Sequence, residues 1–380
     1  MPQKKILYVG LSDVFSRHEL GFIAALADLG RVDVVTLGSR LHIYRQTVGS
    51  DNGLHVVLFY EIPCRNLLRL NLCAEVIKSF LNIEDYDVVF ATPRLPILLV
   101  KTLSHQIGVV VLRLWSIRAA KLKDNLRFGA YEDAFLFIPS LIANLYYILS
   151  STYAIAVDHA TYAFAKKAYS IVANRVLKVY PPYGFIQEKG EVEEAIPEIV
   201  DKGGYVLGLT VLGKKGAYLK FEAKPHAAVL YLLAKKTRHD VVLVGSSYDE
   251  WKRVFPGIEP PRNLHIIGKG FSDNTLAKIY RNARLVITPI TNRNISNRLL
   301  EALFYGKPTI TTEVVKHIHP ELKHKKHVFV SNWDAIIGDS IRLLEGDDLL
   351  ENLEQGAREA YNRFFSTRLN TEVVRRLVLE

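Results

Sequence analysis

Residues 285–311 read LVITPITNRNISNRLLEALFYGKPTIT, and this stretch decides the fold that we expect for the whole chain. Its first four residues are apolar or β-branched and predict a short buried strand, which Pro289 ends. A polar loop follows, and leucines then recur on one side of a helix. Gly306 suits the left-handed position after that helix, and Pro308 prevents the helix from continuing. The pattern therefore predicts strand, loop, helix and strand.

Polar residues occupy the start and the other side of this helix. Asn297, Glu301 and Tyr305 are spaced four residues apart on one side, whereas Asn294 and Ser296 lie at the helix start. Free backbone N–H groups and the positive dipole end make such a start an anion site that would suit a diphosphate. A carboxylate one turn further on can accept two hydrogen bonds from a ribose diol. We therefore interpret Glu301 as a ribose clamp; the alternative is an ordinary exposed carboxylate, with the asparagines acting only as caps.

The segment NRLLEALFYGKPTITT, residues 297–312, resembles the nucleotide-sugar site of retaining glycosyltransferases of family 4, a bacterial and archaeal group with the two-domain GT-B fold. The resemblance extends over most of the chain and is specific from about residue 241 to 311. In that family the second glutamate of an E-x7-E motif holds the ribose, and Glu301 matches it. The first glutamate is replaced by Arg293, whose guanidinium binds phosphate but cannot accept hydrogen bonds from sugar hydroxyls.

Short apolar runs alternate with helical stretches along the chain, which predicts α/β domains with doubly wound parallel sheets. The expected strands are residues 4–9, 32–36, 54–59, 87–91, 109–114, 153–157, 176–180, 205–209, 241–244, 264–267, 285–288, 309–311 and 327–330. With the resemblance, this predicts a GT-B fold, in which two Rossmann-like domains face a central cleft. We expect an acceptor-side domain at 1–184 and a nucleotide-sugar domain at 185–355. By the habit of the family, a helical segment at 356–380 would pack back on the first domain.

The resemblance also implies which residues bind the donor. Lys224 precedes a proline at a helix start and resembles the family lysine that binds the diphosphate, so Lys224 and Glu301 are our candidate catalytic residues. Lys214 or Lys215 would substitute for a family arginine; the alternative is a solvated lysine pair in a glycine-rich turn. The expected donor-binding residues are Lys214, Lys215, Gly245, Gly268, Phe271, Arg293, Asn294, Ser296, Asn297 and Glu301. Phe271 either stacks on the nucleotide base or fills the core.

The first half of the chain offers candidates for the acceptor side. Ser12 and His18 follow the first strand, where the family usually has adjacent glycines near the phosphates. Trp115 follows the strand that ends near residue 114 and offers a stacking face for a sugar, while Arg113 or Arg118 would hold an acceptor phosphate. The alternative for these three is a core tryptophan with surface arginines.

Composition and charge limit the function classes. A net charge of +10 favours acidic partners, but none of the usual nucleic-acid signatures is present, so we expect nucleotide-sugar phosphates and an anionic membrane surface rather than nucleic acid. The two cysteines, Cys64 and Cys73, lie in an apolar stretch that favours buried reduced thiols. The short apolar run after the basic start predicts a first strand and not a signal peptide, so we expect a cytoplasmic protein, peripheral at the inner membrane face. Scarce glutamine and a single methionine indicate a thermophile, and archaeal members exist in the family it resembles.

Two further segments have compositions that are typical of special roles. Residues 134–149, AFLFIPSLIANLYYIL, form the most apolar segment, but they are too short for a membrane span, so we expect a buried helix rather than a membrane-inserted one. The histidines between residues 317 and 327 lack carboxylate or cysteine partners at ligand spacing, so we expect surface positions and no metal site.

Our leading hypothesis is a hexosyltransferase, of class EC 2.4, for polysaccharide or glycoprotein glycan synthesis. It would transfer a sugar, with retention, from a nucleotide-diphosphate donor to a glycan or lipid-linked acceptor. It would need no metal and no cofactor beyond the donor substrate. The alternatives are a non-catalytic GT-B scaffold that binds nucleotide or anionic glycan, which Arg293 motivates, and a sugar-nucleotide epimerase on the same fold.

Overall fold

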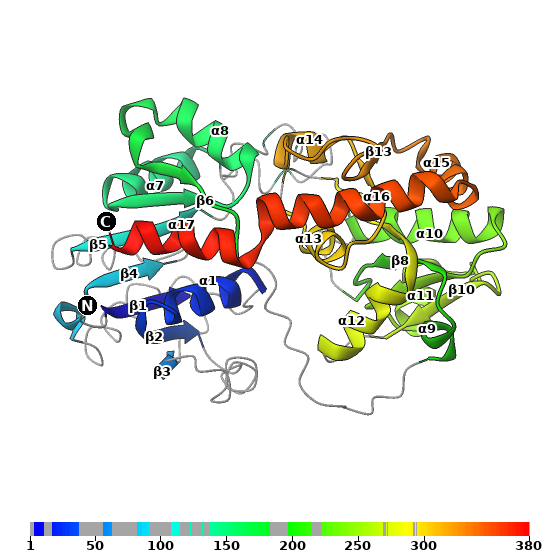
Figure 1. Ribbon diagram of the computed structural model, residues 1–380, viewed down its shortest axis with the longest axis horizontal. Coiled ribbons are helices and arrows are strands. Elements are labelled where there is room, and N and C mark those ends of the chain that lie inside the picture. The colour runs from blue at the N-terminus through cyan, green and yellow to red at the C-terminus, as the bar shows by residue number, and fades with distance from the viewer. Residues whose placement is uncertain are drawn as a thin grey trace. The chain divides into compact units, whose positions relative to one another are not determined.

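The computed structural model describes residues 4–10, 17–37, 56–62, 82–91, 108–114, 122, 126, 131, 137–182, 197–213, 222–268, 271, 273–291, 293 and 295–379. The chain divides into two compact units. Unit 1 comprises residues 1–123, 131–185 and 365–380, and unit 2 comprises residues 124–130 and 186–364. Each unit has its own parallel sheet with helices packed against it (Figure 1).

Unit 1 contains a seven-stranded parallel sheet in the order β3-β2-β1-β4-β5-β6-β7. The strands are β1 (Lys4–Gly10), β2 (Gly30–Leu37), β3 (Val56–Ile62), β4 (Val88–Ala91), β5 (Val109–Leu114), β6 (Tyr153–Ala156) and β7 (Val176–Lys178). The described helices are α1 (Arg17–Ala27), α7 (Phe137–Leu149), α8 (His159–Ala168) and α17 (Thr367–Leu379), with short 3₁₀ helices η3 (Ile83–Asp85) and η5 (Ser170–Arg175). The last helix of the chain, α17, packs against α1.

Unit 2 contains a six-stranded parallel sheet in the order β10-β9-β8-β11-β12-β13. The strands are β8 (Tyr205–Leu209), β9 (Val241–Val244), β10 (Leu264–Ile267), β11 (Ala283–Ile287), β12 (Thr309–Thr312) and β13 (Phe329–Ser331). The helices are α9 (Glu198–Lys202), α10 (Lys224–Lys236), α11 (Tyr248–Val254), α12 (Asp273–Asn282), α13 (Asn297–Phe304), α14 (Val315–Ile318), α15 (Ile336–Glu345) and α16 (Asp347–Ala360), and the π-helical turn η7 (Tyr361–Phe365) follows.

The core of unit 2 lies on both faces of its sheet, because alternate strand residues point to opposite sides. On one face Val206 packs with Leu230 of α10 and Leu343 of α15. On the other face Leu207 packs with Ile279 of α12. Burial on both faces explains why these strands appear in the sequence as continuous apolar runs. The expected α/β fold with two doubly wound parallel sheets is confirmed.

The apolar segment at 134–149 does not form the buried helix that we expected. Its described part is α7, and Ile148 is the residue of this helix that is buried. Ile138, Ile142 and Leu149 instead have more than half of their surface exposed. The expectation failed because apolar composition alone cannot show whether a neighbouring element covers both sides of a helix. Among the described helices, none is both long and apolar enough to cross a membrane.

The expectation of surface histidines was also wrong in part, because His319 and His327 are buried whereas His317 is exposed. In the described part of the chain, no group of three or more histidine, cysteine or acidic residues is placed to hold a metal ion. The two cysteines lie outside the described residues.

Candidate functional site

The strand order of unit 2 reverses between β8 and β11, because β9 and β10 extend the sheet on one side and β12 and β13 extend it on the other. In doubly wound sheets, ligands bind beyond the carboxyl ends of the strands at such a switch point. Helix α10 follows β8 and helix α13 follows β11, so both helices begin on the side where these strands end. The switch point therefore has two helix N-termini beside it, which is favourable for a phosphorylated ligand.

Two polar side chains contact the strand ends at this switch point, and a third pairs with one of them. Arg298, in the first turn of α13, donates a hydrogen bond of 2.7 Å to the Leu209 carbonyl oxygen at the end of β8. Its guanidinium also forms an ion pair with Glu222. His226 of α10 has its Nε2 at 3.0 Å from the Ile287 carbonyl oxygen at the end of β11. Both strand ends are thus held by side chains from the two flanking helices.

The protonation of His226 follows from its surroundings. Burial first, and the positive charge of Arg298 second, lower the pKa of His226 to about 3. The imidazole is therefore neutral near pH 7, and Nε2 carries the proton because the Ile287 carbonyl oxygen can only accept. Nδ1 is then the acceptor that faces the Arg298 guanidinium at 3.4 Å. The neutral ring fits between a carbonyl oxygen and a cation.

Glu301 lies one turn inside α13 and is buried, with 5% of its surface exposed. The alternative of an exposed helix carboxylate is therefore wrong. The Tyr280 hydroxyl of α12 donates a hydrogen bond of 2.7 Å to Glu301 Oε2. The Tyr280 ring stacks on Tyr305 with the ring centroids 5.1 Å apart, and the Arg281 guanidinium lies over the Tyr305 ring. An aromatic pair thus fixes the phenol that holds this carboxylate.

The start of α13 is capped as the sequence predicts. The Ser296 side-chain oxygen accepts a hydrogen bond of 3.4 Å from the Leu299 backbone N–H. Two residues close to Ser296 in the sequence, Asn297 and Arg293, are half-buried. At the other helix start, Lys224 is exposed and its Nζ lies 5.6 Å from the centre of the Phe255 ring.

The loops beyond β8, β9 and β10 are joined by hydrogen bonds. Gly245 has a φ of +97°, which favours glycine, and its N–H donates to the carbonyl oxygens of Ile267 and Gly268 at 3.0 and 3.1 Å. The Ser246 hydroxyl donates to the Thr210 carbonyl oxygen at 2.8 Å. These hydrogen bonds join the loops of Gly245 and Gly268, two of the expected donor-binding residues, into one connected edge of unit 2.

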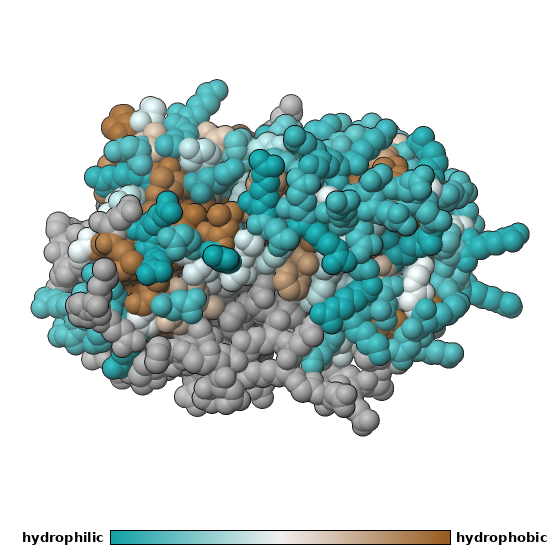
Figure 2. Space-filling model, in the orientation of Figure 1, coloured by the Kyte–Doolittle hydropathy of each residue, from teal (hydrophilic) through white to brown (hydrophobic). Residues whose placement is uncertain are grey.

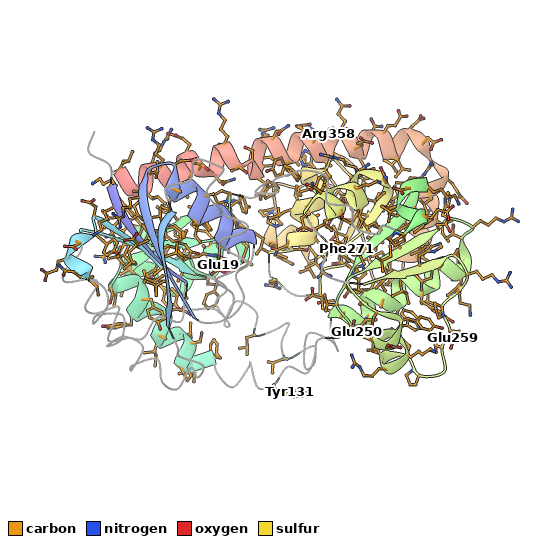
Figure 3. The ribbon with its side chains drawn as sticks, turned by 90° about the horizontal axis from the view of Figure 1, so that it is seen from below. Glu19, Tyr131, Glu250, Glu259, Phe271 and Arg358 are labelled. Atoms are coloured by element: carbon orange, nitrogen blue, oxygen red, sulfur yellow. The ribbon has the colours of Figure 1, made fainter. Side chains whose placement is uncertain are left out.

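Phe271 lies just before α12 and is half-buried (Figure 3). Its ring packs against the core cluster that contains Tyr280 and Tyr305. This placement favours the core-filling alternative over base stacking.

In unit 1, Arg113 lies in β5 with its side chain fully buried. Its guanidinium pairs with Glu19 at 4.0 Å and lies 5.4 Å from the centre of the Phe22 ring. Glu19 lies in the first turn of α1, beside the strands of unit 1 (Figure 3). This burial favours a structural ion pair rather than contact with an acceptor phosphate.

The remaining sequence candidates are not placed by the structure. His18 lies in α1, but its side chain is outside the description. Residues that lie outside the described ranges are Ser12, Trp115, Arg118, Lys214, Lys215 and Asn294.

Sequence reasoning missed Arg298, His226, Glu222 and Tyr280. One usable signal was the isolated His226 among the apolar residues of α10. Another was Arg298, a cation in the first turn of α13, where the helix dipole disfavours positive charge. Tyr280 gave no local signal, because its partner Glu301 is 21 residues away on another helix.

Comparison with known proteins agrees with this geometry. Residues 194–345 match the family model described as glycosyl transferases group 1. No curated protein sequence matches the chain. The fold is similar to sucrose-phosphate synthase from Thermosynechococcus elongatus, with a TM-score of 0.72, 14% identity and coverage of 99% of this chain and 98% of that one.

Two further solved structures are similar over nearly the full length. HepE from Anabaena in complex with UDP and glucose has a TM-score of 0.65 and 13% identity, with 98% of each chain covered. A putative UDP-N-acetylglucosamine 2-epimerase from Listeria monocytogenes has a TM-score of 0.64 and 10% identity, with 100% of this chain and 96% of that one covered. The chain therefore has the GT-B fold, and its residues 194–345 match the glycosyl transferases group 1 model.

Proposed function

We propose that this protein is a retaining glycosyltransferase that transfers a sugar from a nucleotide-diphosphate donor to a glycan or lipid-linked acceptor. The observation that carries the proposal is the buried carboxylate of Glu301, one turn inside the helix that begins at the switch point of unit 2. The match of residues 194–345 to the glycosyl transferases group 1 model supports it. The structure of HepE with UDP and glucose supports a nucleotide sugar as donor.

In this proposal the carboxylate of Glu301 accepts hydrogen bonds from the ribose hydroxyls, and the diphosphate lies at the starts of α10 and α13. Lys224 and the N–H groups that follow Ser296 stabilise the negative charge that develops on the leaving group. The bond between the anomeric carbon and the diphosphate oxygen breaks. The acceptor oxygen bonds to that carbon on the same face, and the departing phosphate oxygen takes the acceptor proton. No metal ion is required by this scheme.

The test is calorimetric titration of a panel of nucleoside diphosphates and nucleotide sugars, UDP-glucose among them, into the wild-type protein and Glu301→Gln. Glutamine replaces one carboxylate oxygen with an NH2 donor and removes the negative charge, so one ribose hydroxyl loses its acceptor and binding should weaken at least about tenfold. Glu351→Gln, which changes an exposed carboxylate of α16, should leave the affinity unchanged. If Glu301→Gln binds as tightly as the wild type, the assignment of the ribose site is wrong.

A sugar-nucleotide epimerase is the second candidate, favoured by the similarity to the putative epimerase, and Arg293 in place of a sugar-binding glutamate motivates a non-catalytic scaffold. Product analysis separates the two, because transfer yields a nucleoside diphosphate and a glycosylated acceptor, whereas epimerisation yields an altered sugar. Retained nucleotide binding with neither product would indicate a non-catalytic scaffold. We also propose a cytoplasmic location for the protein.

A further inference from the structure

Helix α7 of unit 1 exposes an apolar stripe. Ile138, Ile142, Leu145 and Leu149 are 62%, 66%, 37% and 51% exposed. Their spacing of four, three and four residues places them on one side of the helix. The thirteen residues of α7, FIPSLIANLYYIL, include no charged side chain. A surface helix normally presents polar residues outward, so this stripe requires an explanation.

The stripe is distinct from the side by which α7 joins the core. Phe137, Leu141 and Ile148 pack on a cluster that includes Leu114 of β5 and Ala154 of β6. The neighbouring 3₁₀ helix η5 contacts α7 and carries a further exposed aliphatic side chain, Ile171, with 94% of its surface exposed. In the view of Figure 2, hydrophobic surface is more extensive on the described part of unit 1 than on unit 2. We refer to Ile138, Ile142, Leu145, Leu149 and Ile171 as the α7–η5 face.

The charged side chains of the segment that contains α7 and η5 outside its core have one sign. Between residues 137 and 182 the cations are Lys166, Lys167, Arg175 and Lys178. The one carboxylate in this range, Asp158, is fully buried. Its oxygens accept from the Thr161 backbone N–H at 2.7 Å and from the Thr161 hydroxyl at 3.1 Å, so it serves as the N-cap of α8. The exposed ionised side chains of this whole range are therefore positive.

One of these cations, Arg175, is hydrogen-bonded to the last residue of α7. Arg175 donates hydrogen bonds from Nη1 to the carbonyl oxygens of Leu149 and Ser151, at 2.8 and 3.1 Å. Arg175, Asn174 and Thr152 line a surface hollow of about 490 Å³ that Leu149 borders. A polar, cationic hollow next to exposed aliphatic side chains suits an anionic headgroup whose acyl chains lie along the stripe.

We propose that the α7–η5 face docks the protein on an anionic lipid membrane. Aliphatic side chains would enter the interface between headgroups and acyl chains, and the surrounding lysines and arginine would face lipid phosphates. A second copy of this chain is a poorer occupant, because pairing two such faces would bring like charges together. This inference names the location of the lipid-linked acceptor in the proposed function, but its evidence is independent of any sugar donor.

Vesicle co-sedimentation tests the proposal in the absence of nucleotide. The wild-type protein should bind vesicles of phosphatidylcholine mixed with phosphatidylglycerol, and should bind vesicles of phosphatidylcholine alone far more weakly. Binding should weaken as the salt concentration rises. The double variant Ile138→Ser, Ile142→Ser should reduce partitioning by about tenfold or more, since two aliphatic side chains are removed from the interface.

Matched variants separate the contributions. Leu232→Ser removes an aliphatic side chain of 42% exposure from α10 in unit 2 and should leave partitioning unchanged. Lys167→Gln with Lys178→Gln should reduce binding to the anionic vesicles and weaken its salt dependence, since two of the four cations are removed. Circular dichroism and thermal unfolding confirm that each variant is folded.

Four results would overturn the proposal. They are absence of binding to anionic vesicles, equal binding to both vesicle types, an equal loss in Leu232→Ser, and a wild-type dimer that the α7 double variant converts to a monomer without any lipid binding. Because the assay contains no donor, a failure of the proposed glycosyl transfer would leave its outcome unaffected. Conversely, a protein that ignores vesicles could still bind nucleotide sugars.

Discussion

The Tyr280 hydroxyl donates a hydrogen bond of 2.7 Å to Glu301 Oε2, and both side chains are buried. Such a bond to a carboxylate is stronger than one between neutral groups and fixes the direction of the acceptor. The Tyr305 ring stacked on Tyr280 limits the movement of the phenol. Tyr280 is therefore a positioning residue for the carboxylate that the proposed function assigns to the ribose.

Tyr280→Phe should weaken nucleotide affinity about tenfold, because a hydrogen bond to a charged group contributes about 1.5–3 kcal/mol and the carboxylate becomes free to reorient. Tyr205→Phe is the matched control, since its buried hydroxyl donates to the Ile279 carbonyl oxygen in the same core cluster. Both variants should lose stability, but only the first should lose affinity. Equal affinities in calorimetry would remove Tyr280 from the site.

The fold was predictable from the sequence because its strands are buried on both faces. Residues 241–244, VVLV, are a continuous apolar run, and β9 has the bounds that the run predicts. The bounds of β11 were less accurate, because α12 passes directly into this strand and the register shifts between Ala283 and Leu285. A sequence pattern cannot locate such an irregularity, since it depends on pairing with β8.

The site was predictable only where the signal is local. Ser296 and Glu301 could be placed at a helix start because caps and helical spacing are short-range features. The contact between Arg298 and the Leu209 carbonyl oxygen joins residues 89 positions apart, and only the strand order brings them together. The exposure of α7 was missed for the same reason.

His226 should make stability depend on pH. Its pKa is lowered from 6.5 to about 3 in the folded protein, by burial first and by Arg298 second, so only the unfolded chain takes up this proton between these values. Stability from this group is therefore present above about pH 6.5 and is lost, by at most about 1.4 kcal/mol per pH unit, as the pH falls below it. Urea unfolding at about pH 7.5 and about pH 5 measures the difference.

The control for this experiment compares how much the free energy of unfolding changes with pH in each variant, rather than its absolute value. His226→Gln should show a smaller loss of stability on acidification than the wild type, because its side chain does not titrate. His317→Gln, which changes an exposed histidine, should retain the wild-type pH dependence. A wild-type slope in His226→Gln would show that other groups cause the acid sensitivity.

The ion pair of Arg298 and Glu222 should be strongly coupled. Each side chain is 19% exposed, and the arginine also holds the Leu209 carbonyl oxygen. A double-mutant cycle with Arg298→Gln and Glu222→Gln should give a coupling energy of about 1–3 kcal/mol. The exposed pair of Lys316 and Glu313 should give about 0–1 kcal/mol in the same measurement. Equal values for the two cycles would mean that the pair contributes no more than a surface ion pair.

Gly208 of β8 lies where α10 packs closely on the sheet. A Cβ atom at this position would lie 2.4 Å from one methyl carbon of Leu230 and 3.0 Å from His226 Nε2. Gly208→Ala should therefore lower the free energy of unfolding by about 1–3 kcal/mol, because α10 must shift or its side chains must leave their preferred rotamers. Gly338→Ala is the opposite case, since a Cβ there meets no atom within 4 Å and alanine favours the helix α15 by about 0.5–1 kcal/mol. Denaturant unfolding of both variants should give changes of opposite sign. If Gly208→Ala is as stable as the wild type, α10 is not packed tightly enough to hold His226 and the start of α10 in place at the switch point.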